Sequence, residues 1–149
     1  MVMVFSLFWK LERAAAASGL IISHEQRYAG HAMQAGMTAA GSRLAYMLKY
    51  VIVVDDDIDP TDMTEVMWAI GTRCEPETAI HIQKSCWGSA LDPLLPPEKR
   101  ARGQFDHSLA IILACKPYHW INEFPPSIKS KPEALQKIKE KWEGTLRKG

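Results

Sequence analysis

The sequence has 149 residues, of which 47% are hydrophobic and 23% charged, and its formal net charge is +1. This length suits one domain with its own core, and the apolar content argues against intrinsic disorder. The small net charge gives no indication of a nucleic-acid-binding surface, so nucleic acid is not an expected partner. Three widely spaced cysteines without a CxxC pair favour reduced thiols in the cytoplasm, with neither a disulfide framework nor a zinc site.

The first 19 residues open with an apolar stretch that ends in small residues. A signal peptide is not expected, because no basic residue precedes the apolar part and charged residues interrupt the segment after it. No stretch of the sequence approaches the roughly 20 apolar residues of a membrane-spanning helix, so no membrane association is expected. We therefore expect residues 1–19 to form an amphipathic helix, or a non-homologous segment, ahead of the domain.

Four apolar runs predict the strands of a sheet. They are Leu20–Ser23, Tyr50–Val54, Thr78–Gln83 and Leu109–Cys115. Tyr50–Val54 is continuous and β-branched, as in a strand buried on both faces of a parallel sheet, whereas Thr78–Gln83 alternates like a strand near an edge. Helical patterns over Ala32–Leu48 and Asp62–Cys74 separate the first three strands. This order predicts an α/β fold: a three-layer domain with a mostly parallel sheet.

Two segments in the second half of the sequence do not follow the strand pattern. Ser85–Arg102 is rich in proline and predicts an ordered, extended Pro-rich segment. Glu133–Leu146 reads as a charged helix with a narrow apolar stripe, which suits docking on a neighbouring subunit. We expect the α/β domain to occupy residues 20–128 and the C-terminal docking helix to lie within residues 129–149.

An acidic loop, Asp55–Asp59, comes after the central predicted strand. It lies at the carboxyl end of that strand, where ligands of open α/β sheets collect. A calcium loop is excluded, because Pro60 takes the place of the required glycine. Asp55 and Asp57 could instead hold Mn²⁺ or Mg²⁺, as in a small metal-dependent glycosyltransferase. The favoured interpretation is structural, with aspartates that cap the next helix and accept hydrogen bonds from the turn.

The segment HEQRYAGH offers a second candidate site, formed by Arg27, Tyr28 and His31 around a glycine. Backbone N–H groups at a helix start, together with Arg27, suit a carboxylate or a phosphate. The alternative is that Arg27 pairs with a nearby carboxylate and His31 only begins the helix. Both interpretations stay open. The other histidines show no metal-ligand spacing, and no P-loop, GxSxG or GxGxxG motif is present.

Three segments in the same order resemble the UbiD-like decarboxylases, which use prenylated flavin mononucleotide (prenylated FMN). They are QRYAGHAMQA (Gln26–Ala35), the long stretch Lys49–Glu77, and GSALDPLLPPEKR (Gly88–Arg100), followed by Ile111–Phe124 with its CKPYHW core. The resemblance implies a reversible, non-oxidative decarboxylation of aromatic or α,β-unsaturated carboxylic acids. In that chemistry the flavin is the electron sink, and the protein supplies orientation and proton transfer.

Members of this family are several times longer than this sequence, which resembles their C-terminal domain alone. Their N-terminal part binds the flavin with a divalent metal, and potassium is a further candidate ion. It also supplies the catalytic residues, so neither catalytic residues nor a cofactor or metal site is expected in this chain. The resemblance implies a flavin-binding domain or chain as partner, a homo-oligomer, and a cleft near Arg27, Tyr28 and His31. Asp55–Asp59 would be structural or hinge-forming.

The sequence therefore predicts the C-terminal portion of a UbiD-like decarboxylase that is inactive without its flavin-binding domain. One alternative is a separately encoded assembly subunit of such an enzyme. A less favoured one is the glycosyltransferase that would use Asp55 and Asp57.

Overall fold

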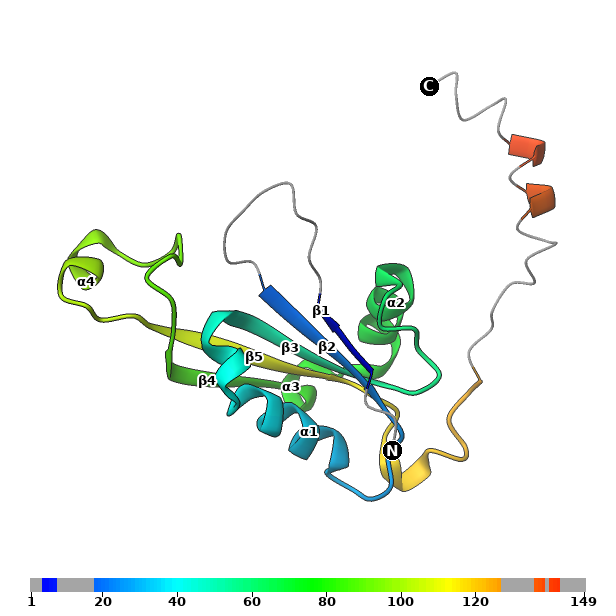
Figure 1. The fold of residues 1–149 in the computed structure, drawn as a ribbon. Coiled ribbons are helices and arrows are strands. Elements are labelled where there is room, and N and C mark those ends of the chain that lie inside the picture. The colour runs from blue at the N-terminus through cyan, green and yellow to red at the C-terminus, as the bar shows by residue number, and fades with distance from the viewer. Residues whose placement is uncertain (1–3, 8–17, 127–135, 139, 143–149) are drawn as a thin grey trace.

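The computed structural model describes residues 4–7, 18–126, 136–138 and 140–142. In this part of the chain five strands form one sheet in the order β1-β2-β3-β5-β4 (Figure 1). The strands are β1 (Val4–Leu7), β2 (Ser18–His24), β3 (Leu48–Asp55), β4 (Ile80–Trp87) and β5 (Asp106–Ala114). The three inner strands β2, β3 and β5 run parallel, and the edge strands β1 and β4 are antiparallel to their neighbours. Each of the four predicted runs overlaps a strand, although Thr78 and Ala79 belong to a short helix and Cys115 follows β5.

The central strand β3 is buried on both faces, as its apolar run predicts. Val51, Val53 and Val54 are fully buried, and β3 is paired on one side with β2 and on the other with β5. Burying each such side chain contributes about 1.5–3 kcal/mol. The sheet is therefore organised around the residues that precede the acidic loop.

Helices cover the two faces of the sheet (Figure 1). Helix α1 (His31–Ala40) packs on the face that carries Leu20, Val51 and Ile111. Helix α2 (Met63–Arg73) packs on the opposite face, against Ile21, Val54 and Ala114. Successive residues of a strand point to opposite faces, so the same three strands serve both helices. The α/β fold with a layered arrangement is thus confirmed.

The predicted helix Ala32–Leu48 is shorter than expected. Helix α1 ends at Ala40 with Gly41 as its C-cap, the short helix η1 (Arg43–Met47) comes next, and Leu48 already belongs to β3. The Ser42 hydroxyl donates to the Ala39 carbonyl oxygen at 2.8 Å, which satisfies one of the free carbonyls at the helix end.

The expectation of a helix in residues 1–19 is wrong where the structure describes that segment. Val4–Leu7 forms strand β1, paired with Leu20–Ser23 of β2, and β2 itself begins at Ser18. Pairing with the otherwise open edge of β2 outweighs local helix preference, because each edge strand leaves unpaired backbone groups.

The remaining elements lie on the far side of β5. Helix α3 (Pro76–Ala79) precedes β4, so that strand begins two residues later than the predicted Thr78 and forms the sheet edge opposite β1. Helix α4 (Pro97–Ala101) lies in a projection between β4 and β5 (Figure 1), which we call the arm (residues 88–105). The arm includes most of the predicted Pro-rich segment, with turns and a short helix in place of a purely extended chain.

The predicted docking helix lies mostly outside the described residues. Residues 136–138 and 140–142 are helical, and Ile138 and Trp142 are exposed. In the part of the chain that the structure describes, no helix has the length and apolarity needed to cross a membrane.

Candidate functional site

Three loops meet at the end of the sheet where the parallel strands β2, β3 and β5 have their carboxyl ends. A cavity of about 300 Å³ opens between the loop after β2 and the loop after β5. It is lined by the loop after β2, the first turn of α1, the end of α2 and the loop after β5, which includes the short helix η2 (Tyr118–Trp120). Residues on its wall include Gln26, Gly30, Met33, Arg73, Lys116 and Tyr118.

The carboxylate of Asp55 links these loops through hydrogen bonds. This carboxylate is buried and accepts a hydrogen bond from Nη1 of Arg73 at 2.9 Å. It also accepts from the backbone N–H of Lys116 at 2.7 Å and from Nε2 of Gln26 at 2.7 Å. Gln26 donates in addition to the Lys116 carbonyl oxygen at 2.8 Å. One carboxylate thus joins the ends of three elements.

Asp57 completes this network on the outer side. Both terminal nitrogens of Arg73 donate to its two carboxylate oxygens, at 2.7 and 2.9 Å, and the Lys116 ammonium lies 2.8 Å away. The hydrogen bonds from Arg73, with a smaller contribution from Lys116, hold the pKa of Asp57 well below its usual range, although burial opposes them. Asp57 is therefore ionised at neutral pH and well into the acidic range.

Arg73 is the most deeply buried cation of the described chain, with a side chain that has no exposed surface. Burial disfavours its charged form, but the hydrogen bonds and charges of Asp57 and Asp55 outweigh burial and raise the pKa of the guanidinium. Its Cζ atom lies 5.2 Å from the centre of the Trp68 ring and 5.9 Å from that of Phe124, within cation–π range.

These pairings decide between the interpretations of the acidic loop. The carboxylates of Asp55 and Asp57 bind donors of the same chain, and no group of possible metal ligands comes together among the described residues. Asp59 accepts from the Thr61 backbone at 2.8 Å, and Asp62 accepts from the Thr64 backbone at 2.8 Å as the N-cap of α2. These hydrogen bonds and ion pairs are the ones that the structural interpretation of the loop expects.

The three candidate residues of the HEQRYAGH segment, Arg27, Tyr28 and His31, lie close together at the start of α1. The Tyr28 ring stacks on the His31 imidazole at 4.5 Å, and the Arg27 backbone N–H donates to His31 Nδ1 at 3.3 Å. The exposed Arg27 guanidinium lies 3.6 Å from Glu25, which is the pairing that the alternative interpretation expected. Gly30 precedes the helix with a φ of 88°, a value that favours glycine.

His24 is a residue of this site that the sequence did not single out. It is only 5% exposed, and neither ring nitrogen has a hydrogen-bond partner among the described residues. Its ring meets the edge of His31 at 4.8 Å, and burial followed by the charge of His31 lowers its pKa. Strand alternation from Leu20 and Ile22 was the available signal, since it places His24 on the face that α1 covers.

The loop after β5 closes the site from the other side. The Tyr118 hydroxyl donates to the Arg27 carbonyl oxygen at 2.7 Å, so this loop is joined directly to the loop after β2. Cys115 lies beneath the loop with its Sγ atom 3.3 Å from the Val53 carbonyl oxygen. Burial raises the pKa of this thiol well above its usual value, so it is a core thiol.

Comparison with known proteins identifies the fold. A family model described as the 3-octaprenyl-4-hydroxybenzoate carboxy-lyase (UbiD) C-terminal domain matches residues 8–114. The match begins inside the N-terminal segment that we expected to lie outside the family domain. A phenolic acid decarboxylase of Sedimentibacter hydroxybenzoicus is 38% identical over 81 residues, which cover 53% of this chain and 17% of the relative.

Solved structures agree with the family match. The vanillic acid decarboxylase ShVdcCD of Sedimentibacter hydroxybenzoicus in its open form superposes with a TM-score of 0.62 and 29% identity, covering 88% of this chain and 27% of that chain. The UbiD-class enzyme HmfF of Pelotomaculum thermopropionicum, in complex with FMN, gives a TM-score of 0.65 and 30% identity, covering 79% and 24%. This chain spans about a quarter of the length of these structures. Since the family model matches more than half of its residues, the chain belongs to the UbiD carboxy-lyase family, as the C-terminal domain.

Proposed function

We propose that this chain is the C-terminal portion of an enzyme that reversibly and non-oxidatively decarboxylates aromatic or α,β-unsaturated carboxylic acids with prenylated FMN. It acts together with a flavin-binding domain or chain and is inactive without it. The family match, the phenolic acid decarboxylase among its relatives and the FMN bound to HmfF support this assignment.

The observation that carries the proposal is the cavity at the carboxyl ends of the parallel strands. Its walls are two loops joined by the hydrogen bond from Tyr118 to Arg27, and both loops rest on the buried carboxylate of Asp55. Arg27, Tyr28 and His31 do not line this cavity but lie next to Ala29 and Gly30 of its wall, and His24 packs against His31. We assign to these residues the side of the substrate cleft that faces the flavin-binding part, which they help to close and to keep dry.

The flavin and its ions are assigned to that other part. A flavin phosphate requires cations or free backbone N–H groups, and both Arg73 and Lys116, which line the cavity, are bound to Asp57. Arg73 and Lys116 are therefore already paired within this chain, and we assign to the chain positioning and enclosure in the reaction.

The test is an activity measurement with and without the flavin-binding part. The purified chain, incubated with prenylated FMN and a phenolic acid such as vanillate, should neither retain the flavin nor release CO₂. The same chain co-expressed with its flavin-binding part should do both. Turnover by the isolated chain would overturn the proposal, as would full activity of the flavin-binding part by itself.

A second candidate is a separately encoded assembly subunit of such a decarboxylase. It is favoured by one observation, namely that ShVdcCD has been solved with a component named ShVdcD in truncated form. Size-exclusion chromatography distinguishes the two. An assembly subunit would change the oligomeric state of an already active flavin enzyme, whereas a C-terminal portion would be required for any activity.

A further inference from the structure

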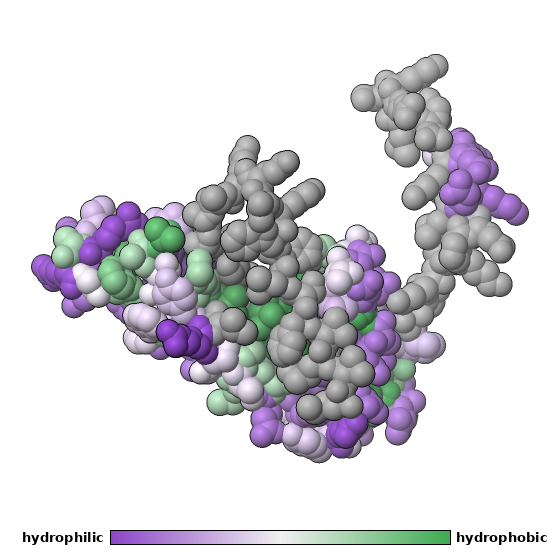
Figure 2. Space-filling model, in the orientation of Figure 1, coloured by the Kyte–Doolittle hydropathy of each residue, from purple (hydrophilic) through white to green (hydrophobic). Residues whose placement is uncertain are grey.

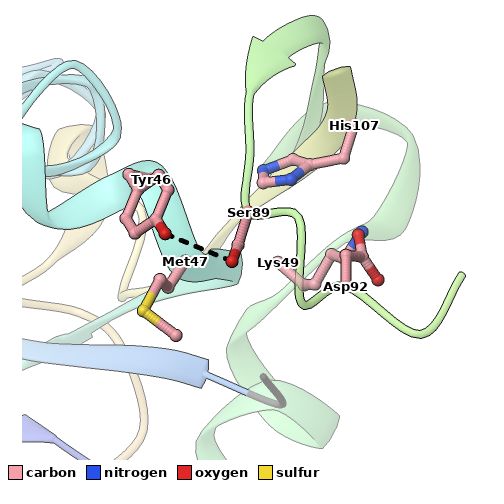
Figure 3. A pocket seen from close by; sticks show the side chains of 6 residues that line it. All are labelled: Tyr46, Met47, Lys49, Ser89, Asp92 and His107. Carbon is pink, nitrogen blue, oxygen red and sulfur yellow. Dashed lines mark hydrogen bonds and ion pairs between the residues drawn. The ribbon is translucent and has the colours of Figure 1, made fainter. Parts of the chain in front are cut away.

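A second group of titratable side chains lies at the opposite end of the sheet, where the arm begins. Figure 3 shows Lys49 of β3, His107 of β5, Tyr46 of η1, and Ser89 and Asp92 of the arm around a small cavity. The cavity measures about 10 Å³, roughly the room that one water molecule needs. The Tyr46 hydroxyl donates to the Ser89 hydroxyl at 3.2 Å.

Asp92 connects the arm to the sheet. It is 6% exposed and forms an ion pair with the Lys49 ammonium. Its other carboxylate oxygen accepts from the Leu94 backbone N–H at 3.0 Å, and its carbonyl oxygen accepts from the Arg100 guanidinium at 3.1 Å. The same residue therefore shapes the first turn of the arm and anchors it to β3.

His107 is enclosed beside this ion pair. Its Nε2 atom is buried without a hydrogen-bond partner among the described residues. Gly88 lies against the imidazole, where an added Cβ would come 2.7 Å from the Phe105 carbonyl oxygen and closer still to the ring. The Gly88 N–H donates to that same carbonyl at 2.6 Å, so the beginning and the end of the arm are held together over the histidine.

Charged groups face His107 from three elements. Lys49 of β3 opposes its protonation, whereas Asp92 of the arm and Asp106 of β5 favour it. Burial, followed by Lys49, lowers the pKa of His107 below its ordinary value of 6.5, so the ring is neutral at neutral pH. Tyr46 and Ser89 contribute hydroxyl groups to this cluster.

We propose that Lys49, Asp92 and His107 form a pH-sensitive latch that holds the arm against the sheet when His107 is neutral and releases it when His107 is protonated. Protonation adds a proton from solvent to the ring and places a second cation beside Lys49, while the carboxylate of Asp92 is already paired with Lys49 and that of Asp106 with Lys99. A buried cation without a partner is costly, and movement of the arm lets water reach it.

The lowered pKa of His107 sets the direction in which stability changes with pH. The unfolded chain takes up a proton near pH 6.5, above the pH at which the folded chain does. The stabilisation by the latch is therefore complete above that value and is lost as the pH falls from it toward the lower pKa of the folded state.

The latch would control an apolar surface. Trp87, Leu91 and Leu94, at the base and on the first part of the arm, are 69%, 67% and 79% exposed. The Trp87 ring lies 5.1 Å from that of Tyr46, beside the latch. Figure 2 shows hydrophobic residues among hydrophilic ones on the arm. Release of the arm would change how these side chains are presented together.

Backbone ¹⁵N relaxation of the full chain at about pH 7.5 and about pH 5.5 tests the latch. We expect order parameters of the arm amides to fall from about 0.85 to below about 0.6 on acidification. His107→Gln, which cannot take up the proton, should show the same arm dynamics at both pH values. His119→Gln, on η2 far from the arm, should keep the wild-type response. Arm dynamics that do not change with pH, or that change equally in His107→Gln, would overturn the latch.

An NMR titration of the wild-type histidines keeps the test decisive should His107→Gln fail to fold. The midpoint of His107 should lie below its ordinary value of 6.5. In Lys49→Met, the repulsion is removed and Asp92 becomes available to the imidazolium, so the midpoint of His107 should move to higher pH. A His107 midpoint at or above 6.5, or one that Lys49→Met leaves in place, would contradict the proposal.

Discussion

Charged side chains are buried at the centre of this molecule because each is matched by an opposite charge. Arg73 reaches from the last turn of α2 to the carboxylates of Asp55 and Asp57. From the loop after β5, the Lys116 ammonium pairs with Asp57, and the Lys116 backbone N–H donates to Asp55. An isolated buried ion would cost several kcal/mol, so each member of this network stabilises the others. The side chains of this network pair with one another where water molecules would otherwise bind them, and they thereby join the loops that carry the candidate site.

Replacement of Arg73 by methionine tests this arrangement. Arg73→Met should lower the free energy of unfolding by about 3–5 kcal/mol, since it leaves the buried Asp55 carboxylate without its cation. Arg102→Met, at the exposed end of α4, is the matched control and should change stability by less than about 0.5 kcal/mol. Urea unfolding followed by circular dichroism measures both. Equal effects of the two substitutions would show that the network is not stabilising.

Asp57 should make the folded state sensitive to strong acid. Its pKa is lowered in the folded state, so the stabilisation it supplies is complete above its ordinary value of 3.8 and is lost as the pH falls below that value. Asp57→Asn should be less stable than wild type at neutral pH and lose less stability on acidification. Thermal unfolding between about pH 6 and about pH 3 checks this prediction, and parallel curves for the two proteins would contradict it.

His24 offers a way to separate function from stability. Both ring nitrogens lack partners in the described chain, so His24→Phe removes an unsatisfied polar group and should leave the thermal midpoint of the isolated chain unchanged or higher. In the assembled enzyme, the same variant should lower kcat/KM at least tenfold if the imidazole faces the cleft. Activity equal to wild type would place His24 outside the reaction.

At the scale of elements, the close approach of α1 to β5 explains a helix that is rich in alanine and glycine. An added Cβ on Gly36 would lie 2.6 Å from Cγ2 of Ile111, which is fully buried in the core. A larger residue would push the helix away from the sheet and with it the loop that carries Arg27 and Tyr28. The small residues of α1 thus set the position of one wall of the cavity.

Alanine substitutions in the two helices should have opposite effects. Gly36→Ala should destabilise the chain by about 1–3 kcal/mol through overpacking against Ile111. Gly71→Ala in α2 meets nothing within 4 Å and should stabilise it by about 0.5–1 kcal/mol, the usual helical gain. Thermal unfolding of the two variants measures the difference. Stabilisation by both would mean that α1 adjusts its distance from the sheet without cost.

At the scale of the whole molecule, the chain is an α/β domain in which the two ends of the parallel strands carry different features. The carboxyl ends of the parallel strands carry the candidate cleft, with its network of paired charges. The other end carries the arm and its proposed latch. The chain spans about a quarter of the length of the matched structures.

The sequence alone determined the strands β2, β3 and β5, the helix α2 with its Asp62 cap, and the resemblance to the UbiD family. These features depend on periodicity and on local hydrogen bonds, which a one-dimensional pattern contains. Only the tertiary structure decided that Arg73 binds Asp57, 16 residues away, and that His24 lies buried against His31. It also decided that Val4–Leu7 pairs as a strand. The physical reason is that burial and charge pairing depend on which segments the folded sheet brings together, and distance along the chain does not encode that.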